Sequence, residues 1–488
     1  MKLKYLLILI LNVLIVSATI AQRGRPKYGR QLSGTKVTDE QKAFMRGHLD
    51  IMAEFTDTTN SGIIEFPVKI HVVQKSDGSE GTTVDEVKQA IKKLNTFFLK
   101  IYVRFVPLGD YNYINNDFFH KFNKDTEDEF CKTQDVPNVI NLYIVGSIKS
   151  GYSSYCGYTY PPSSTKNVDR IFIAKKYLDN GVTLARQAGH YFSLYPTHGP
   201  DEDKRSDELV NGTNCATTGD CICDTPADPK LDSRSVDERC GYIGQMKDGN
   251  NKFYRPALDN IMCDNPRFEC RKTFTNEQYK RMQYCATYIR KYITFPKNEF
   301  SKKQLKSLML RSGVEASMDF KVNGSPMPVE LTKNLYKGKW PCQAGDEYQI
   351  DLMNSRKGYI YVLEGDKQRG VNVVYPGKND KIYFKDERTF HIIPQEEGKM
   401  FKIDNNKGRD GLNYVCVLFS KKQLAIKDYV KELRSVRGDW DLMQIVYQVF
   451  GQHLVPAHDI EYSPKSVKFT SITAERYIVP VFMELEQE

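Results

Sequence analysis

The chain has 488 residues, of which 40% are hydrophobic, 27% charged and 12% aromatic, and its formal net charge is +9. This length predicts two or three domains with substantial cores, and the composition is typical of a folded globular protein, which excludes a disordered or fibrous chain. The positive charge is scattered apart from one dense patch at Arg23–Arg30. A short basic tail is usually solvated, so we infer no nucleic-acid binding from it.

Residues 1–21 have the pattern of a secretory signal peptide. Lys2 and Lys4 give the charged start, an apolar stretch covers 6–16, and Ala21 ends a suitable cleavage site. The alternative is a membrane anchor, but the apolar stretch is short for a bilayer span. We therefore expect an exported protein that is periplasmic, cell-surface or secreted, and that is not an integral membrane protein after cleavage.

Residues 22–60 combine the basic tail with a helix expected near 39–55. From residue 61 onward predicted strands and helices alternate, as in chains that mix both in one domain. A capping box at Thr83 and Glu86 opens a helix with an apolar face formed by Val84, Val87, Ile91, Leu94 and Phe98. The expected strands lie at 63–73, 101–107, 139–145 and 170–174, and further helices start at Thr183 and Thr275.

Residues 196–260 read as a long polar loop region, which disulfides or ions would have to hold in place. Six of the eleven cysteines lie in or near it, at Cys215, Cys221, Cys223, Cys240, Cys263 and Cys270. In an exported protein these cysteines should form disulfides rather than a zinc site. Because eleven is odd, at least one thiol stays free, and the sequence does not fix the pairing.

From about residue 300 the pattern changes to short alternating runs broken by glycine and asparagine, which is typical of a β-rich domain. The expected strands there lie at 348–352, 359–363, 371–375, 390–393 and 414–418. The sequence therefore predicts an α+β chain. Its first domain covers 61–295, and a β-rich, sandwich-like domain covers 300–488.

The segment 184–198 is close to the pattern of a zinc-protease helix. A metzincin site reads H-E-x-x-H-x-x-G-x-x-H, because two histidines four residues apart share one helix face and a third histidine completes the zinc tripod. The glycine-bearing frame around His190 is present here. The replaced positions are Arg186 for the first histidine, Gln187 for the general-base glutamate, Ser193 for the turn glycine and Pro196 for the third histidine.

Several motifs in order resemble the pappalysin–cytophagalysin family of metzincin metallopeptidases, particularly its secreted bacterial branch. They are IIEFPVKIHVV at 63–73, the frame T-L-x-x-x-x-G-H-Y-F-x-L-Y-x-T-H-G at 183–199, Asp207–Val210, 214–220, 223–229 and Asn260–Met262. The resemblance covers roughly 61–295. It implies a twisted mixed sheet above the helix of the metal site, with Met262 as the methionine turn. A transition-state tyrosine of the family would fall at Asp264.

The second half, 300–488, resembles a bacterial domain of unknown function that is often appended to exported or surface proteins. The residues that carry this resemblance are Tyr336-x-x-x-Trp340, Gly345–Tyr348, Gly358–Leu363, Tyr375-Pro376 and Gly411–Phe419. It implies a β-sandwich-like module and no particular activity.

The zinc chemistry does not carry over to these residues. The guanidinium of Arg186 stays protonated and offers no lone pair, and Pro196 has no donor atom. His190 is then the only retained zinc-ligand position, and one imidazole does not hold zinc usefully. Gln187 is a neutral amide that cannot accept a proton from water. We also expect Arg186 to form a partly buried ion pair with Asp264, because an unpaired buried guanidinium is costly.

The resemblance implies that this chain keeps one ion site of the family. The segment around Asp220 is similar to the family's calcium loop, in which an aspartate, a backbone carbonyl and a threonine supply oxygen ligands. Those positions are Asp220, Cys223 (backbone) and Thr225. Oxygen ligands on an irregular loop suit calcium. An Asx-type turn without an ion is the other interpretation.

Three functions are consistent with these residues. The first is an exported pseudopeptidase without zinc that binds a peptide or protein partner or serves as a scaffold. The second is an active secreted zinc endopeptidase with a rebuilt metal site, for which His198, Asp201 and Asp203 lie just downstream. The third is a purely structural component of an envelope or secretion assembly. We expect the first, with no catalytic residue and no zinc.

Overall fold

The structure is a computed structural model with a mixed α and β fold. It describes residues 33–55, 62–165, 167–201, 204–232, 234–296, 302–366, 370–377, 380–385, 389–403, 412–436, 440–472 and 475–487. The expected signal peptide and basic tail lie outside the described residues. No described helix is long and apolar enough to span a bilayer.

The chain divides by its contacts into two compact units. Unit 1 comprises Met1–Phe55, Lys69–Glu86 and Asp110–Arg290, and unit 2 comprises Thr56–Val68, Val87–Gly109 and Lys291–Glu488. Strand β1 (Ile64–Gln74) and helix α4 (Val84–Phe98) each contribute to both units.

One sheet has the strand order β2-β1-β5-β9-β8, and β3 also pairs with β1. β1 is parallel to β2 and β3, β5 is parallel to β9, and β8 is antiparallel to β9. β5 reads INLYIV and is buried throughout, as expected of a parallel strand covered on both faces. The bounds are β2 Val103–Pro107, β3 Asn112–Asn115, β5 Ile140–Val145, β8 Gly157–Thr159 and β9 Arg170–Ala174.

Helices α4 and α8 begin at the capping residues that the sequence predicts. α4 buries Val87, Ile91, Leu94 and Phe98 from the predicted apolar face, whereas Val84 at its first position is exposed. Thr275 and Gln278 form a capping box that opens α8 (Asn276–Tyr284). The single helix expected near 39–55 is two helices, α2 (Asp39–Arg46) and α3 (Leu49–Glu54), because α2 ends at Gly47.

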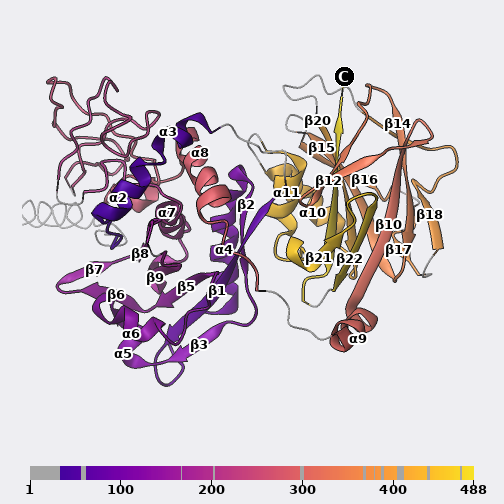
Figure 1. Ribbon diagram of the computed structural model, residues 1–488, viewed down its shortest axis with the longest axis horizontal. Helices are drawn as coiled ribbons and strands as arrows, with labels where there is room; N and C mark the ends of the chain where they lie inside the picture. The colour runs from indigo at the N-terminus through magenta and orange to yellow at the C-terminus, as the bar shows by residue number, and fades with distance from the viewer. Residues whose placement is uncertain are drawn as a thin grey trace, which may run out of the picture. The chain divides into compact units, whose positions relative to one another are not determined.

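Unit 1 also contains a small sheet and two short helices. The sheet has the order β4-β6-β7. The bounds are β4 Lys121–Asn123, β6 Ser147–Ser150, β7 Ser153–Tyr155, α5 Asp117–His120 and α6 Glu127–Cys131. Helix α7 (Val182–Tyr191) packs against β8 and β9 (Figure 1).

Unit 2 contains two further sheets, each of seven strands. One has the order β18-β14-β10-β22-β21, with β11 beside β10 and β19 beside β14. The other has the order β12-β13-β23-β20-β15-β16, with β17 beside β15. The expectation of a β-rich second half is therefore met by two sheets.

The strand and helix bounds of unit 2 follow the chain from residue 302 to 486. The strands are β10 Gly313–Val322, β11 Ser325–Pro326, β12 Val329–Thr332, β13 Leu335–Gly338, β14 Glu347–Asn354, β15 Gly358–Asp366, β16 Gly370–Tyr375, β17 Tyr383–Phe384, β18 Thr389–Ile393, β19 Phe401–Lys402, β20 Leu412–Ser420, β21 Ile460–Tyr462, β22 Val467–Ile472 and β23 Ile478–Glu486. The helices are α9 Lys302–Ser312, α10 Ile426–Ser435 and α11 Leu442–Phe450.

Alternation along β20 explains how these strands pack. Val415 and Val417 point into a core that both sheets share, where Ile350 of β14 also lies. Cys416 and Leu418 point to the other face, into a second core with residues of α11. Successive strand residues face opposite sides, and here both sides are covered (Figure 1). The sequence analysis did not foresee α10 and α11.

Candidate functional site

Helix α7 carries the degenerate zinc motif and is buried on all sides. Its residues Thr183–Tyr191 are all buried. Gly189 lies against Met262, because a Cβ at Gly189 would come within 2.9 Å of the sulfur of Met262. Met262 itself is fully buried, and the carbonyl of Met262 accepts a hydrogen bond from the backbone of Thr197 at 3.1 Å. Met262, the residue expected at the methionine turn, therefore lies against α7.

The chain leaves α7 through Ser193, which has a positive φ of 75°. This left-handed conformation favours glycine, the residue that the zinc-protease pattern has at this position. The backbone of Leu194 donates a hydrogen bond to the carbonyl of Gly189 at 2.9 Å and closes the turn. The turn is therefore present although its glycine is replaced. Pro196, at the place of the third histidine, is buried just beyond it.

Arg186 lies where the first zinc histidine is expected, and it is 1% exposed. Its Nη2 donates to Oδ1 of Asp264 in an ion pair. Its Nη1 donates to the backbone carbonyls of Ile261 at 3.0 Å and Cys263 at 3.2 Å. The guanidinium therefore binds the backbone on both sides of Met262. The predicted ion pair between Arg186 and Asp264 is confirmed.

The ion pair lowers the pKa of the Asp264 carboxyl group. Burial is the largest single effect and would raise the pKa of this carboxyl, but the positive charges of Arg186, His198 and Arg271 together outweigh it and lower the pKa to about 2. The side chain of Asp264 is 32% exposed, whereas that of Arg186 is 2% exposed. Asp264 is therefore a stable anion that neutralises a buried cation.

The two histidines near this pair are buried. Nδ1 of His190 lies 2.9 Å from the carbonyl oxygen of Leu194 and donates to it. Burial and then the charge of Arg186 lower the pKa of His190 to about 3, so its imidazole is neutral. Nδ1 of His198 lies 3.7 Å from Oδ2 of Asp264, and burial lowers the pKa of His198. Within the described ranges, Nε2 of His190 and both ring nitrogens of His198 lack a hydrogen-bond partner.

The donor set does not fit zinc. A guanidinium and a proline occupy two of the three ligand positions, and neither has a lone pair to give. The described residues include no group of three or more His, Cys, Asp or Glu side chains that could hold a metal ion. Among the residues considered for a rebuilt site, Asp201 forms an ion pair with Lys42 at 2.5 Å, and Asp203 lies outside the described residues.

Gln187, at the place of the general base, is in contact with the chain's own N-terminal segment. Its Oε1 accepts a hydrogen bond from Oγ1 of Thr35 at 3.0 Å, and its Nε2 donates to Oγ of Ser33 at 3.4 Å. The backbone of Gly34 donates to the carbonyl of Gly157 at 2.9 Å, and Ser33 forms a parallel bridge with Gly157.

The segment 33–35 therefore adds to the edge of the sheet at β8. An edge strand offers unpaired backbone groups that an extended segment can bind. Oγ1 of Thr35 accepts from the backbone of Thr159 at 3.1 Å, and Nζ of Lys124 donates to the carbonyl of Gly34 at 2.8 Å. The sequence analysis missed this contact, since nothing in Ser33-Gly-Thr35 marks it.

The cysteine-rich segment contains two disulfides, Cys215–Cys223 and Cys240–Cys270. Disulfides within 215–270 were predicted, and this is confirmed. The free cysteines include Cys131, Cys221, Cys263, Cys285, Cys342 and Cys416.

The expected calcium loop contains the predicted Asx-type turn. Oδ1 of Asp220 accepts from the backbone of Ile222 at 3.0 Å and from Oγ1 of Thr225 at 2.9 Å. The carbonyl nearest to Oγ1 of Thr225 is that of Ile222, at 2.7 Å, one residue before the expected Cys223. The backbone nitrogen of Cys223 donates to Glu277 at 2.9 Å.

The same loop also has acidic oxygens without partners. Oδ2 of Asp220 and Oε2 of Glu208 are buried and have no hydrogen-bond partner in the described part of the chain. Glu208 lies against the loop, because a Cβ at Gly219 would come within 2.1 Å of its Oε2. Burial raises the pKa of Asp220 to about 7. Burial, followed by the charges of Asp220 and Asp228, raises the pKa of Glu208 to about 8.

These orphaned oxygens fit a hard cation such as calcium, which takes carboxylate, hydroxyl and carbonyl oxygens together. The sequence analysis assigned no role to Glu208, although it lies in Asp207–Val210, a motif quoted for the resemblance. Two buried carboxyl groups with raised pKa values on one loop are the signal that only the structure supplies.

Comparisons with known proteins do not assign this site. No family model and no curated sequence matches the chain. Among solved structures, the chain is similar to the crystal structure of wild-type OgpA from Akkermansia muciniphila, with 7% sequence identity, coverage of 76% of this chain and 93% of that chain, and a TM-score of 0.21. A score this low carries no argument about fold or function.

Proposed function

We propose that the chain is an exported pseudopeptidase of the pappalysin–cytophagalysin type, with a metzincin-like first domain that has lost zinc and acts as a binding or scaffold protein. The observation that supports this most is the Arg186–Asp264 ion pair against the methionine-turn backbone. It puts a fixed cation where a metal would need electron-pair donors. The pair stabilises the turn without any chemistry.

Under this proposal, the residues at the positions of the zinc motif cannot carry out the catalytic steps of a zinc peptidase. Hydrolysis needs a polarised water and a base that removes its proton. Gln187 is an amide held by Thr35, and the buried imidazole of His190 uses Nδ1 to bind a backbone carbonyl. We therefore expect no peptidase activity.

The segment 33–35 favours a scaffold over an open peptide-binding cleft. It covers Gln187 and pairs with β8, the edge at which an added strand would bind. A purely structural role in an envelope or secretion assembly is the second candidate, and this same contact supports it. A peptide or protein partner would then bind a surface other than this edge.

Calcium belongs to the proposal as a structural ion. Asp220, Glu208 and Thr225, with a carbonyl of the loop, would hold it, and the ion would supply charge neutralisation that stabilises the disulfide-linked region. The support is the pair of buried acidic oxygens without partners. Export is part of the same proposal and rests on the signal-peptide pattern and the two disulfides.

The test is a metal analysis of the purified full chain, joined to a protease assay on denatured casein. We expect far less than one equivalent of zinc, no cleavage, and no change in either result for His190→Ala. One equivalent of zinc together with cleavage, both lost in His190→Ala, would contradict the proposal. A zinc-loaded, active chain would instead be the endopeptidase with a rebuilt site.

A further inference from the structure

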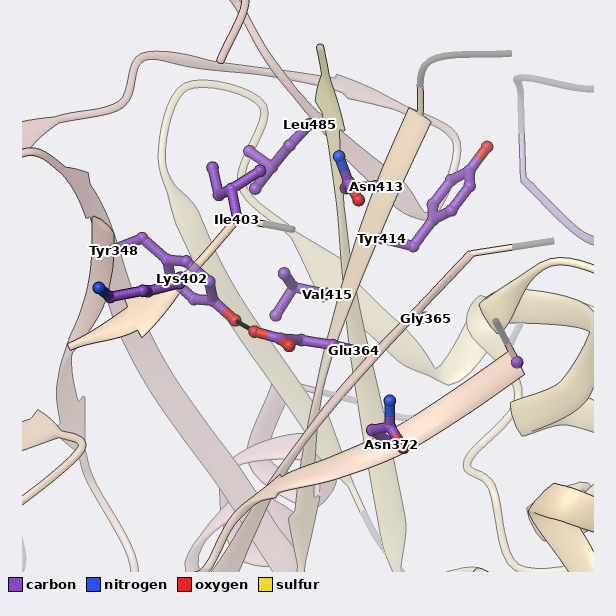
Figure 2. Close-up of a pocket in the computed structure, with 11 residues that line it drawn as sticks. Tyr348, Glu364, Gly365, Asn372, Lys402, Ile403, Asn413, Tyr414, Val415 and Leu485 are labelled. Carbon is purple, nitrogen blue, oxygen red and sulfur yellow. Dashed lines mark hydrogen bonds between the residues drawn. The ribbon is translucent and has the colours of Figure 1, made fainter. Parts of the chain in front are cut away.

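A hollow in unit 2, lined by strands of both large sheets, has polar side chains that satisfy one another. Figure 2 shows the hydroxyl of Tyr348 and the carboxylate of Glu364 pointing toward each other, and the hydroxyl donates to Oε1 of Glu364. Lys402 forms an ion pair with Glu347 at 3.4 Å, and the volume of the hollow is only about 40 Å³. Because these groups have internal partners, none of them calls for a ligand.

Buried arginines are balanced in the same way at several places in the chain. The ion pairs are Arg104 with Glu65 at 2.5 Å, Arg186 with Asp264, and Arg290 with Asp169 at 3.1 Å. A buried guanidinium costs free energy unless an anion lies close to it. A buried arginine without a carboxylate is therefore a place where an anion is expected.

Arg271 in unit 1 is such a residue. It is 3% exposed, and no carboxylate of the described residues lies within 4.0 Å of its guanidinium. Its Nη2 donates to the backbone carbonyl of Asn265 at 2.6 Å, and its Nε has no hydrogen-bond partner in the same part of the chain. A backbone carbonyl is a neutral acceptor, so it satisfies one N–H group but does not neutralise the charge.

The neighbouring ion pair does not neutralise Arg271 either. Burial, followed by the positive charge of Arg186, lowers the pKa of Arg271 to about 10, and the negative charge of Asp264 acts more weakly in the opposite direction. Arg186 therefore repels Arg271 more strongly than Asp264 attracts it. Arg271 still carries its proton at neutral pH, because its pKa stays above that range.

A second group with unmet hydrogen bonds lies around the same carboxylate. His198 is 3% exposed, and neither of its ring nitrogens has a hydrogen-bond partner among the described residues. Its Nδ1 lies 3.7 Å from Oδ2 of Asp264, and both His198 and Arg271 lower the pKa of Asp264. A histidine ring has at least one N–H donor in either protonation state. The side chain of Asp264 is 32% exposed, so this cluster is open to solvent at Asp264.

We infer that Arg271 and His198 bind a small monovalent anion of the size of chloride beside the Arg186–Asp264 pair. Nε of Arg271 donates to the anion, which supplies the missing counter-charge, and an N–H of His198 is the second donor. Because Arg186, His198 and Arg271 are all 3% exposed or less, a one-atom anion suits the site better than a phosphate. A water molecule would satisfy the N–H groups but would leave the charge of Arg271 unbalanced. The inference goes beyond the proposed function, since a chain without peptidase activity can bind or lack this anion.

The test is thermal unfolding of the full chain as sodium chloride replaces sodium gluconate at constant ionic strength. EGTA in every buffer keeps calcium from contributing. An ion that binds the folded chain alone raises Tm with a saturable dependence on its concentration. We expect such a rise with chloride and with bromide, because gluconate is too large for the site. A Tm that is the same in chloride, bromide and gluconate overturns the inference and leaves water at Arg271.

Substitutions assign the anion to these residues. Arg271→Gln should abolish the chloride-dependent rise in Tm, and His198→Ala should raise the half-saturating chloride concentration by roughly 3- to 10-fold, the effect of one lost hydrogen bond. Arg239→Gln is the matched control, because it removes the same charge from an exposed arginine of the same cysteine-rich segment. It should respond like the unaltered chain. An equal chloride response in Arg271→Gln and Arg239→Gln overturns the assignment.

A measurement on the unaltered chain keeps the inference testable if Arg271→Gln does not fold. Bromide scatters X-rays anomalously, so crystals soaked in sodium bromide report where the anion binds. We expect a bromide peak within hydrogen-bonding reach of Nε of Arg271. Bromide peaks on the surface alone, at a concentration that saturates the rise in Tm, overturn the inference.

Discussion

Two regions of unit 1 bury charged side chains, and they differ in how those charges are balanced. At α7, Arg186 and Asp264 form an ion pair. At the loop around Asp220, two buried carboxyl oxygens have no hydrogen-bond partner within the described chain. We call the first region the compensated site, because its buried charge has an internal counter-charge, and the second the uncompensated site.

The largest expected effect comes from breaking the compensated site. Asp264→Ala should lower the free energy of unfolding by about 3 kcal/mol, because it leaves the buried guanidinium of Arg186 without its counter-charge. Urea denaturation measures this change. The control is Asp201→Ala, which removes a partner of Lys42 whose side chain is 42% exposed and should cost less than about 1 kcal/mol. Equal losses in the two variants would mean that Arg186 does not depend on Asp264.

The uncompensated site should respond to its ion. Calcium at about 100 times its dissociation constant should stabilise the full chain by about 2.7 kcal/mol, seen as a higher Tm. Glu208→Gln and Asp220→Asn should remove this gain. Zinc should give no corresponding gain through His190. A calcium-induced shift that persists in both variants would place the ion elsewhere in the chain.

The two regions should also respond to pH in opposite directions in calcium-free buffer. The pKa of Glu208 is raised from 4.5 to about 8 and that of Asp220 from 3.8 to about 7. Folding therefore loses their contribution as pH rises from about 4 to 8, because the unfolded chain releases these protons first. The pKa of Asp264 is lowered from 3.8 to about 2, so its contribution is lost as pH falls through that range.

Measuring Tm from pH 3 to pH 9 in EGTA tests the expected change in stability in both pH ranges. Glu208→Gln should flatten the decline between pH 4.5 and 8, and Asp264→Asn should reduce the loss below pH 3.8. Calcium should remove the decline at higher pH, because it favours the ionised carboxylates. An unchanged profile in Glu208→Gln would show that this carboxyl is not buried in its neutral form.

The smallest expected effect concerns the segment that covers Gln187. Thr35→Ala should cost about 1 kcal/mol, because Oγ1 of Thr35 donates to Gln187 and accepts from the backbone of Thr159. Thr217→Ala is a suitable control, since Oγ1 of Thr217 makes one exposed hydrogen bond to a carbonyl. Thermal unfolding of both variants gives the comparison. No loss in Thr35→Ala would mean that segment 33–35 does not hold the edge at β8.

Local patterns in the sequence predicted the parts of the fold that depend on neighbouring residues. The capping box at Thr275 and the apolar face of α4 follow from residues within a few turns of each other. The sequence analysis did not identify α11, whose run LMQIVYQVF is mostly apolar and buried almost throughout. A short apolar run can be mistaken for a strand. The helical signal was nevertheless present, because Asp441 and Gln444 form a capping box and Gln444 and Gln448 lie four residues apart.

The sequence by itself determined what three residues of the candidate site cannot do. The guanidinium of Arg186 and the ring of Pro196 cannot ligate a metal, and the amide of Gln187 cannot accept a proton from water, because these limits are properties of the residue types. The disulfide-bearing stretch was equally plain from the cysteine spacing.

Only the tertiary structure decided which distant groups meet. Thr35 and Gln187 are 152 positions apart, and nothing local to either residue specifies the other. The burial of Glu208 against Gly219, which gives the loop its unpartnered acidic oxygens, is a contact of the same kind. Hydrogen bonding and charge act through space at a few ångströms, so their partners are fixed by how the sheet edge and the loops pack rather than by the order of residues.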